Sequence, residues 1–337
     1  TGGSNTLTLS TENNIANADI TASGAISGVT TLTISNAGGT ATLSGDVDVT
    51  TLAVGNTVAN LAFTGNGSTV TNDIDFANDG TLTLGTSGGT QTYNGGLDTS
   101  GVGSTVTLNG SIITSNDAIT LGAITLGSAT TINASSSDTT GDITVGAVTG
   151  GSNSLTLSTG DNVASTDISA NGNISGVTTL TLSDVGGTAT FAGDVDVTTL
   201  TVGNTVANVA LNGDGSTVTN TVSFANDGTL QLADATGDTL TFNGGVTTTG
   251  VGGTVTLNGT INASDDAITL GAVTLGSNTT VDTNAASTNT ADLTIGAVTG
   301  GSNTLTLSTE NNIANADITA SGAISGVTTL TISNAGG

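Results

Sequence analysis

The sequence predicts an all-β protein, a parallel β-solenoid with turns of roughly 20 to 30 residues and no helices. Short segments alternate apolar and polar residues, as in Thr6–Ser10, where Leu7 and Leu9 share one face. Comparable segments recur at roughly that interval, with Gly, Asn and Asp between them. No stretch keeps the spacing of three and four between apolar residues that an amphipathic helix requires.

A much longer repeat is superimposed on these turns. Residues 1–39 return unchanged as residues 299–337, and a diverged copy occupies residues 149–187. We therefore interpret the chain as a segment of one continuous solenoid, with a first long repeat over 1–148, a second over 149–298 and the start of a third at 299. Each long repeat is expected to contain roughly six or seven turns and to rise about 30 Å, because parallel strands lie about 4.8 Å apart.

The predicted strands of the first long repeat follow one another at short intervals. In order, they begin at Thr6, Thr31, Thr40, Asp46, Leu52, Leu61, Ile74, Leu82, Thr90, Val106 and Ile119. Val, Ile and Thr are frequent in these segments because a branched Cβ favours extended backbone. The intervening corners, such as Asn36–Gly39, contain residues that tolerate positive φ.

The second long repeat differs from the first by two single-residue insertions. One falls between Gly85 and Tyr93 and the other follows Ile132, and both are expected in corners, where the chain leaves the stacked core. The polar stretches 133–141 and 282–291 are predicted to project as loops.

The core is predicted to consist of small aliphatic side chains. The chain has 51 Gly, five Phe and one Tyr, too few rings to anchor a broad globular core. Tyr93 becomes Phe242 in the second long repeat, so we assign the ring to packing. A tandem array of β-sandwiches, the alternative fold, is disfavoured for want of aromatic anchors. The turns are expected to have about three sides or an oval outline, with the hand of the coil left open.

The charge balance excludes several kinds of partner. The chain has 26 acidic residues and no Lys, Arg or His. Nucleic-acid binding requires cations against phosphates, and binding to an anionic bilayer would be opposed. No apolar run has the length of a membrane-spanning helix, so no membrane insertion is predicted. The absence of Lys and Arg also removes cleavage sites for trypsin-like proteases, which suits a durable extracellular protein, although compositional drift of a repeat explains it equally well.

Acidic corners suggest a calcium hypothesis. The candidate ligands are Asp73, Asp79, Asp214 and Asp227, which lie among Asn and Gly residues. Calcium prefers such hard oxygen ligands, but Asn and Asp are also ordinary corner residues. The sequence contains neither an EF-hand loop nor a Gly-Gly-x-Gly-x-Asp array. No other cofactor is predicted.

No enzymatic activity is predicted. Asp46 and Asp48 alternate with Val47 and Val49, which places the carboxylates on the solvated face of a strand. Catalysis by paired carboxylates requires a cleft with two different environments. A polysaccharide lyase would be the natural enzyme on such a scaffold, but its usual basic groups are missing from this chain.

Recurrent Thr-x-Thr segments suggest a binding function instead. Thr6 and Thr8, like Thr31 and Thr33, are expected to point outward from the same face. Flat rows of threonine on a solenoid can order water or contact ice or carbohydrate. Threonine is also an ordinary residue on the outward side of a strand.

Short segments similar to Thr51–Asn56, Asn78–Gly85 and Gly103–Gly110 occur throughout the chain. Through these short repeated strand segments, the sequence resembles the strand-repeat-rich β-solenoid regions of giant bacterial surface proteins, the autotransporter passengers and filamentous-haemagglutinin-like adhesins. The resemblance implies a secreted protein, extracellular or at the cell surface, that forms a stalk, fibre or surface-layer element. Its expected partners are further units of the same array, by continuation or self-association. The alternative is an adhesin whose repeated outer faces bind glycan, ice or another surface directly.

Overall fold

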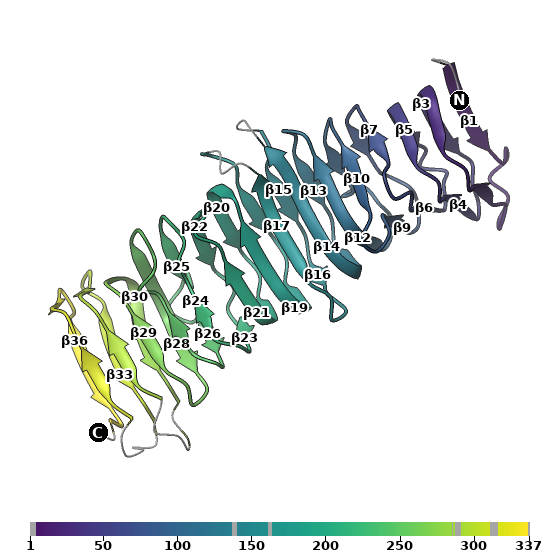
Figure 1. Ribbon diagram of the computed structural model, residues 1–337. Helices are drawn as coiled ribbons and strands as arrows, with labels where there is room; N and C mark the ends of the chain where they lie inside the picture. Colours follow the sequence, from purple (N-terminus) through teal and green to yellow (C-terminus); the bar gives the residue numbers. More distant parts are fainter. Residues whose placement is uncertain are drawn as a thin grey trace. The chain divides into compact units, whose positions relative to one another are not determined.

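A computed structural model of the chain describes residues 5–136, 140–160, 164–284, 286, 291–310 and 316–335. The chain divides into two compact units, Thr1–Ile168 and Ser169–Gly337. Within each unit, short strands stack in parallel over successive turns, which confirms the predicted parallel β-solenoid (Figure 1). No helix occurs among the described residues. The division falls inside the second long repeat, so the continuity of the solenoid from one unit to the next stays a prediction.

The first unit consists of short strands separated by corners. They are β1 (Asn5–Ser10), β2 (Ile20–Ala22), β3 (Ile26–Ser35), β4 (Thr40–Leu43), β5 (Val47–Val54), β6 (Asn60–Phe63), β7 (Thr69–Val70), β8 (Ile74–Asp75), β9 (Leu82–Leu84), β10 (Thr90–Tyr93), β11 (Leu97–Asp98), β12 (Val106–Thr114), β13 (Ile119–Leu121), β14 (Ile124–Ser136), β15 (Ile143–Val145), β16 (Val148–Thr149) and β17 (Leu155–Gly160). β18 (Ile168–Ala170) spans the boundary between the units.

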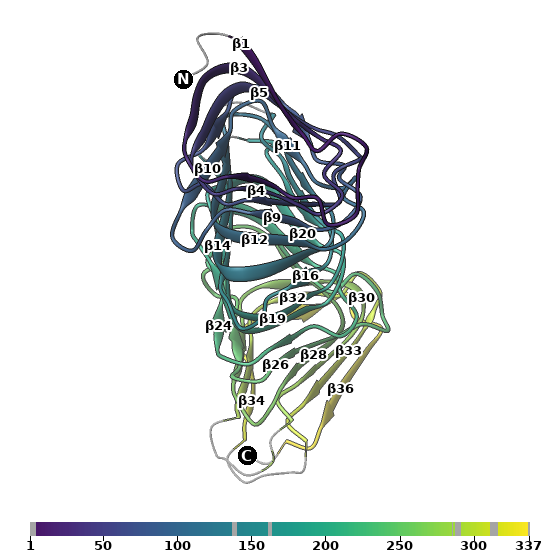
Figure 2. The same cartoon turned by 90° about the vertical axis from the view of Figure 1, so that its right-hand side faces the viewer.

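Each turn of the first unit contributes one segment to each of three stacks. Stack 1 contains β2, β4, β6, β9, the first halves of β12 and β14, and β16. Stack 2 contains the first halves of β3 and β5, then β7, β10, the second halves of β12 and β14, and β17. Stack 3 contains β1 and the second halves of β3 and β5, and in later turns β8, β11, β13 and β15. Figure 2 shows β1, β3 and β5 side by side.

The second unit repeats this plan. Its strands are β19 (Ile174–Ser183), β20 (Val185–Phe191), β21 (Val195–Val202), β22 (Val206–Leu211), β23 (Thr217–Val218), β24 (Val222–Ser223), β25 (Leu230–Leu232), β26 (Thr239–Phe242), β27 (Val246–Thr247), β28 (Val255–Ala263), β29 (Ile268–Leu270), β30 (Val273–Asp282), β31 (Leu293–Ile295), β32 (Val298–Thr299), β33 (Thr304–Ser308), β34 (Ile318–Ala320), β35 (Ile324–Ser325) and β36 (Thr329–Ser333).

Three stacks again account for the strands of this unit. Stack A contains β20, β22, β25, the first halves of β28 and β30, β32 and β35. Stack B contains the first halves of β19 and β21, then β23, β26, the second halves of β28 and β30, β33 and β36. Stack C contains the second halves of β19 and β21, and in later turns β24, β27, β29, β31 and β34.

The turns vary in length because their corners do. A short turn connects Val106 to its register partner Ile124, 18 residues later, and a long one connects Thr279 to Leu305, 26 residues later. Segments predicted as separate strands at 46–49 and 52–54 form the single strand β5. The backbone stays extended through this corner because the Thr50 carbonyl accepts a hydrogen bond from the Asn72 N–H of the next turn, at 2.8 Å.

The predicted loops begin later than expected. Residues 133–136 still belong to β14 and residue 282 to β30. Residues 137–139, 285 and 287–290 lie outside the described part of the chain. The other insertion does fall in a corner, which precedes β10 in the first unit and β26 in the second.

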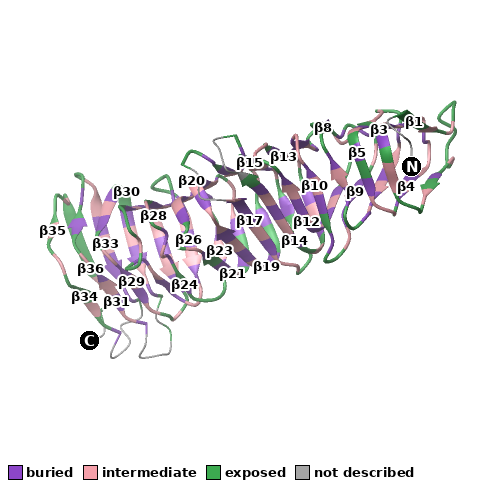
Figure 3. Cartoon of the chain, turned by 45° about the horizontal axis from the view of Figure 1, so that its top comes forward, coloured by how far each residue is buried: buried purple, intermediate pink, exposed green. Residues whose placement is uncertain are grey.

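Buried residues alternate with more exposed ones along many strands of each unit, as predicted (Figure 3). Along β12, buried and half-exposed positions alternate without exception. All five Phe and Tyr93 are fully buried among Leu, Ile and Val side chains. The Tyr93 ring packs edge-on against Phe63 and Phe76, with centroids 6.4 Å apart in each case, so its assignment to packing is confirmed.

Candidate functional site

The four candidate calcium ligands lie on exposed corners. Asp73 and Asp79 belong to the first unit, and Asp214 and Asp227 to the second. Among the residues that the structure describes, no group of three or more acidic side chains is placed to hold a metal ion. Asp79 lines a shallow depression of about 240 Å³ together with Asn14 and Asn56. Calcium binding therefore stays a prediction, without a preformed cage in the described part of the chain.

Asp73 instead forms part of a row of carboxylates in the first unit, which we call the acidic edge. The acidic edge consists of Asp73, Asp75, Asp98 and Asp117, and Asp75 and Asp98 are register partners in stack 3. Although Asp73 is exposed overall, partial desolvation of its carboxyl raises the pKa, and repulsion from the other three carboxylates raises it further, against the opposing hydrogen bond from the Ile74 N–H. Sequence reasoning singled out Asp73 but missed its three neighbours.

The second unit replaces most of the acidic edge by hydroxyl groups. Thr221, Ser223 and Thr247 stand where the first long repeat has Asp73, Asp75 and Asp98, and Asp266 stands where it has Asp117. There the corner forms a depression of about 330 Å³, lined by Thr221, Thr247 and Asp266 among others. The acidic edge is therefore dispensable for the fold and is a feature of one long repeat.

Other Asp and Asn side chains hold adjacent turns together. Asp46 Oδ1 accepts a hydrogen bond from the Gly67 N–H at 2.9 Å, and its counterpart Asp194 accepts one from Gly215 at 2.8 Å. Each bond joins residues 21 positions apart, which is one turn of the solenoid. Asn60 and Asn208 accept in the same way from the turns that follow them. These polar corners thus contribute to stacking, since each satisfies a backbone donor.

Outward threonines form rows along the stacks. Thr83, Thr107, Thr125 and Thr149 are successive register partners in stack 1, and we call them the hydroxyl ladder. In stack A of the second unit, the counterparts are Gln231, Thr256, Thr274 and Thr299. Neighbouring side chains in such a row are about 4.8 Å apart. The Thr-x-Thr pairs of β1 and β3 are also aligned in register, but β5 interrupts one of their two rows with Ala53.

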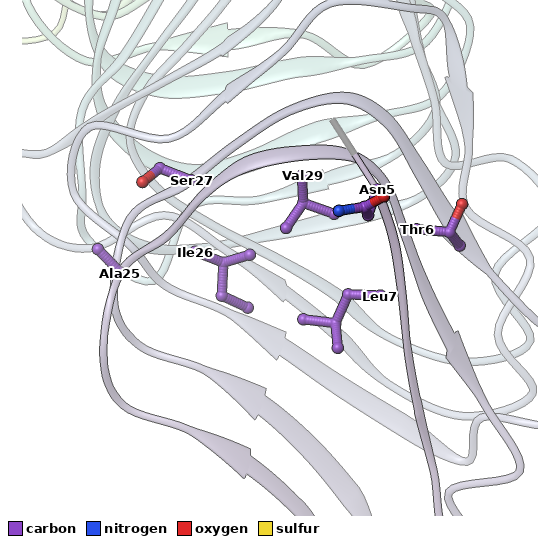
Figure 4. Close-up of a pocket in the computed structure, with 7 residues that line it drawn as sticks. All are labelled: Asn5, Thr6, Leu7, Ala25, Ile26, Ser27 and Val29. Atoms are coloured by element: carbon purple, nitrogen blue, oxygen red, sulfur yellow. The ribbon is translucent and has the colours of Figure 1, made fainter. Parts of the chain in front are cut away.

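Side chains at the first strand of the first unit surround an open pocket of about 390 Å³ (Figure 4). Leu7, Ile26 and Val29 converge on the interior of the turn, whereas Thr6 and Ser27 point away from it. Leu7 and Leu9 are half-exposed here. Their counterparts in β33, Leu305 and Leu307, are fully buried because β30 precedes that strand in stack B.

The last strand of the second unit shows the reverse situation. Leu330 and Ile332 in β36 are 41% and 58% exposed, while Leu32 and Ile34 in the identical segment of β3 are fully buried. The register is the same in both copies, since Leu7 pairs with Leu32 and Leu305 pairs with Leu330. β5 covers β3, and among the described residues no strand follows β36 in its stack. Burial of this segment therefore depends on the turn stacked against it.

The chain matches no protein-family model, no curated protein and no solved structure. In its described part, no helix has the length and hydropathy needed to cross a membrane.

Proposed function

We propose that the chain is a structural element of a bacterial stalk, fibre or surface layer outside the cell, built from parallel turns that stack along one axis. The observation that carries the proposal is how the burial of the repeated strands depends on their neighbouring turns. The strands at residues 6–10 and 31–35 have the same sequences and the same register as those at 304–308 and 329–333, and their Leu and Ile side chains are fully buried where turns lie on both sides. Such a segment is an interchangeable layer of an extendable stack. The extracellular and bacterial setting rests on the sequence resemblance.

The contacts between turns suit a load-bearing element. In a parallel solenoid the backbone hydrogen bonds between strands run along the axis of stacking, so each turn is held by its two neighbours. Side-chain bonds add to them at the corners, as between Asp46 and Gly67 in the first unit and between Asp194 and Gly215 in the second. Tension along the axis would load these bonds in every stack of a turn.

Electron microscopy of proteins with one and two added copies of the long repeat tests the proposal. We expect unbranched rods of constant width that lengthen by about 30 Å with each added copy, from about 4.8 Å per turn. Globular beads separated by linkers, or particles that widen instead of lengthening, would contradict it. The unextended chain is the control for width.

The hydroxyl ladder supports a second candidate function, an adhesin that binds uncharged carbohydrate through its outer faces. Thr107 and Thr125 present adjacent hydroxyl groups on one side of the first unit, and the chain has no cation to attract an anionic glycan. Replacing both residues with Lys should abolish retention by neutral glycans, whereas Lys at Thr120 and Thr144 in stack 3 should not. Absence of retention by the unmodified chain, together with no freezing hysteresis, would eliminate this function.

A further inference from the structure

Copies of one segment occupy different stacks of the first unit. β1 lies in stack 3, where Leu7 pairs with Leu32 in the second half of β3. Its counterpart one long repeat later, β17, lies in stack 2, where Thr156 pairs with Thr131 in the second half of β14. The strands β1 and β17 share the sequence Leu-Thr-Leu-Ser, yet they lie on different sides of the same unit.

The pairings give the number of turns between these copies. Each pairing within a stack joins two adjacent turns, so one step along a stack is one full turn. From the first half of β3, six such steps along stack 2 lead through β5, β7, β10, β12 and β14 to β17. One step down stack 3 leads from the second half of β3 to β1. The two halves of β3 are one stack apart, which is a third of a turn. β1 and β17 are therefore separated by six and two-thirds turns.

The second unit gives the same number independently. Leu180 lies in the second half of β19, in stack C, and pairs with Leu200. Its counterpart Leu330 lies in stack B, seven steps along from the first half of β19. Because the halves of β19 are a third of a turn apart, the interval is again six and two-thirds turns. The shift is in the same direction along the chain as in the first unit.

We infer that every long repeat presents its outward surface one side further round the solenoid than the long repeat before it. A surface feature carried by each long repeat then faces three directions in succession and regains its first direction after three long repeats. Three long repeats contain twenty turns, which is about 96 Å along the axis at about 4.8 Å per turn. The sequence spacing of 148 and 150 residues is therefore not a whole number of turns.

This geometry restricts the kind of partner that the array can bind through a repeated surface. A flat, extended partner lying along one side would meet equivalent positions only at every third long repeat. A partner that contacts one long repeat at a time, with a footprint within about 30 Å, can bind from any side. The inference concerns the display of a surface and holds whether or not the chain is a structural stalk.

Disulfide trapping between adjacent turns tests the inference, since the chain has no cysteine of its own. Outward residues paired in register lie within the Cα separation that a disulfide spans, about 4.4 to 6.8 Å. We expect Thr131→Cys with Thr156→Cys to form a disulfide under mild oxidation, as measured by mass spectrometry after digestion with an Asp-specific protease. Thr144→Cys with Thr156→Cys should form none, because β15 belongs to stack 3.

The opposite pattern would overturn the inference. If a long repeat contained a whole number of turns, β17 would lie in the stack of β1, and Thr156→Cys would be trapped with Thr144→Cys instead of Thr131→Cys. Thr120→Cys with Thr144→Cys, register partners within stack 3, is the positive control for trapping in that stack. The second unit supplies a replicate, in which Thr280→Cys should pair with Thr306→Cys, and Thr294→Cys should not. Circular dichroism of the reduced variants shows whether each has folded.

Discussion

Two inward positions of the same turn are polar in the first long repeat and apolar in the second. In the first, Gln91 and Tyr93 are both fully buried, and the Tyr93 hydroxyl donates to Gln91 Oε1 at 2.9 Å. Gln91 Nε2 donates in turn to the carbonyls of Phe63 and Gly65. In the second, Leu240 and Phe242 occupy these positions and are equally buried. The fold therefore specifies these inward positions by volume, and it accommodates polar groups there because they hydrogen-bond to one another and to the backbone.

In another pair of neighbouring turns, a large and a small buried side chain exchange places between the two long repeats. Leu43 pairs with Phe63 in stack 1, while their counterparts Phe191 and Leu211 pair in stack A with the large and small side chains exchanged. All four are buried. The sum of the two volumes is thus kept while its distribution between the turns is not. The solenoid interior is continuous from one turn to the next, and adjacent turns compensate one another.

Removing either ring should have the largest effect. Tyr93→Ala and Phe242→Ala each create a cavity between stacked turns, and each should cost about 3 to 5 kcal/mol of stability. Tyr93→Ala should cost more, because Tyr93 contacts two rings and donates a hydrogen bond to Gln91, whereas Phe242 contacts Phe224 alone among the described aromatic pairs. Urea denaturation followed by circular dichroism measures both. Equal costs would show that the second ring contact and the hydroxyl of Tyr93 together add nothing to stability.

Removing the buried hydrogen bonds of Gln91 should have the next largest effect on stability. Gln91→Ala removes the partner of the Tyr93 hydroxyl and the side-chain donor to the Gly65 carbonyl, whereas the Phe63 carbonyl still accepts from the Gly85 N–H. The variant should cost about 2 to 4 kcal/mol, from the cavity and the lost hydrogen bonds. Gln91→Leu combined with Tyr93→Phe reproduces the second long repeat and should stay within about 1.5 kcal/mol of the original chain. If the double variant is as unstable as Gln91→Ala, the two turns are not interchangeable.

Exchanging the volumes of neighbouring turns should have a smaller effect. Leu43→Phe alone overfills the space beside Phe63 and should cost about 1 to 3 kcal/mol. Adding Phe63→Leu recreates the arrangement of Phe191 and Leu211 and should recover most of that loss. Denaturation midpoints of the single and double variants measure the coupling. Additive effects would contradict compensation between turns.

The acidic edge should give the smallest effect, and one that depends on pH. The raised pKa of Asp73 means that the folded state disfavours its charged form. Its stabilising contribution is therefore present below the usual Asp pKa of 3.8 and is lost as pH rises through the higher folded value. Asp73→Thr, which copies Thr221, should raise the melting temperature slightly at neutral pH and lose this advantage in acid. Asp48→Thr is the control, since Asp48 lies outside the acidic edge, and an equal gain there would point to net charge alone.

Alternation of residues was enough to predict the strands and their inward faces, because a period of two leaves few choices when one side is buried. It also allowed the role of Tyr93 to be predicted, since Phe242 keeps the ring. Gln91 was missed, although it shares the face of Tyr93 and corresponds to Leu240. The partners of Asp73 could not be predicted, because the corners between Asp75, Asp98 and Asp117 differ in length and the register depends on them. Likewise, the six and two-thirds turns in each long repeat can be derived only when the strand pairings have assigned the segments of every turn to three stacks.

Fibre diffraction from oriented arrays of the long repeat tests the central claim most directly. Parallel turns predict a meridional reflection at about 4.8 Å, with strands across the fibre axis. Six and two-thirds turns per long repeat predict layer lines that index on a period of about 96 Å, with a further meridional repeat at about 32 Å. Layer lines that index on about 32 Å alone would show that each long repeat faces the same side, and absence of the meridional reflection at about 4.8 Å would contradict the stacked solenoid itself.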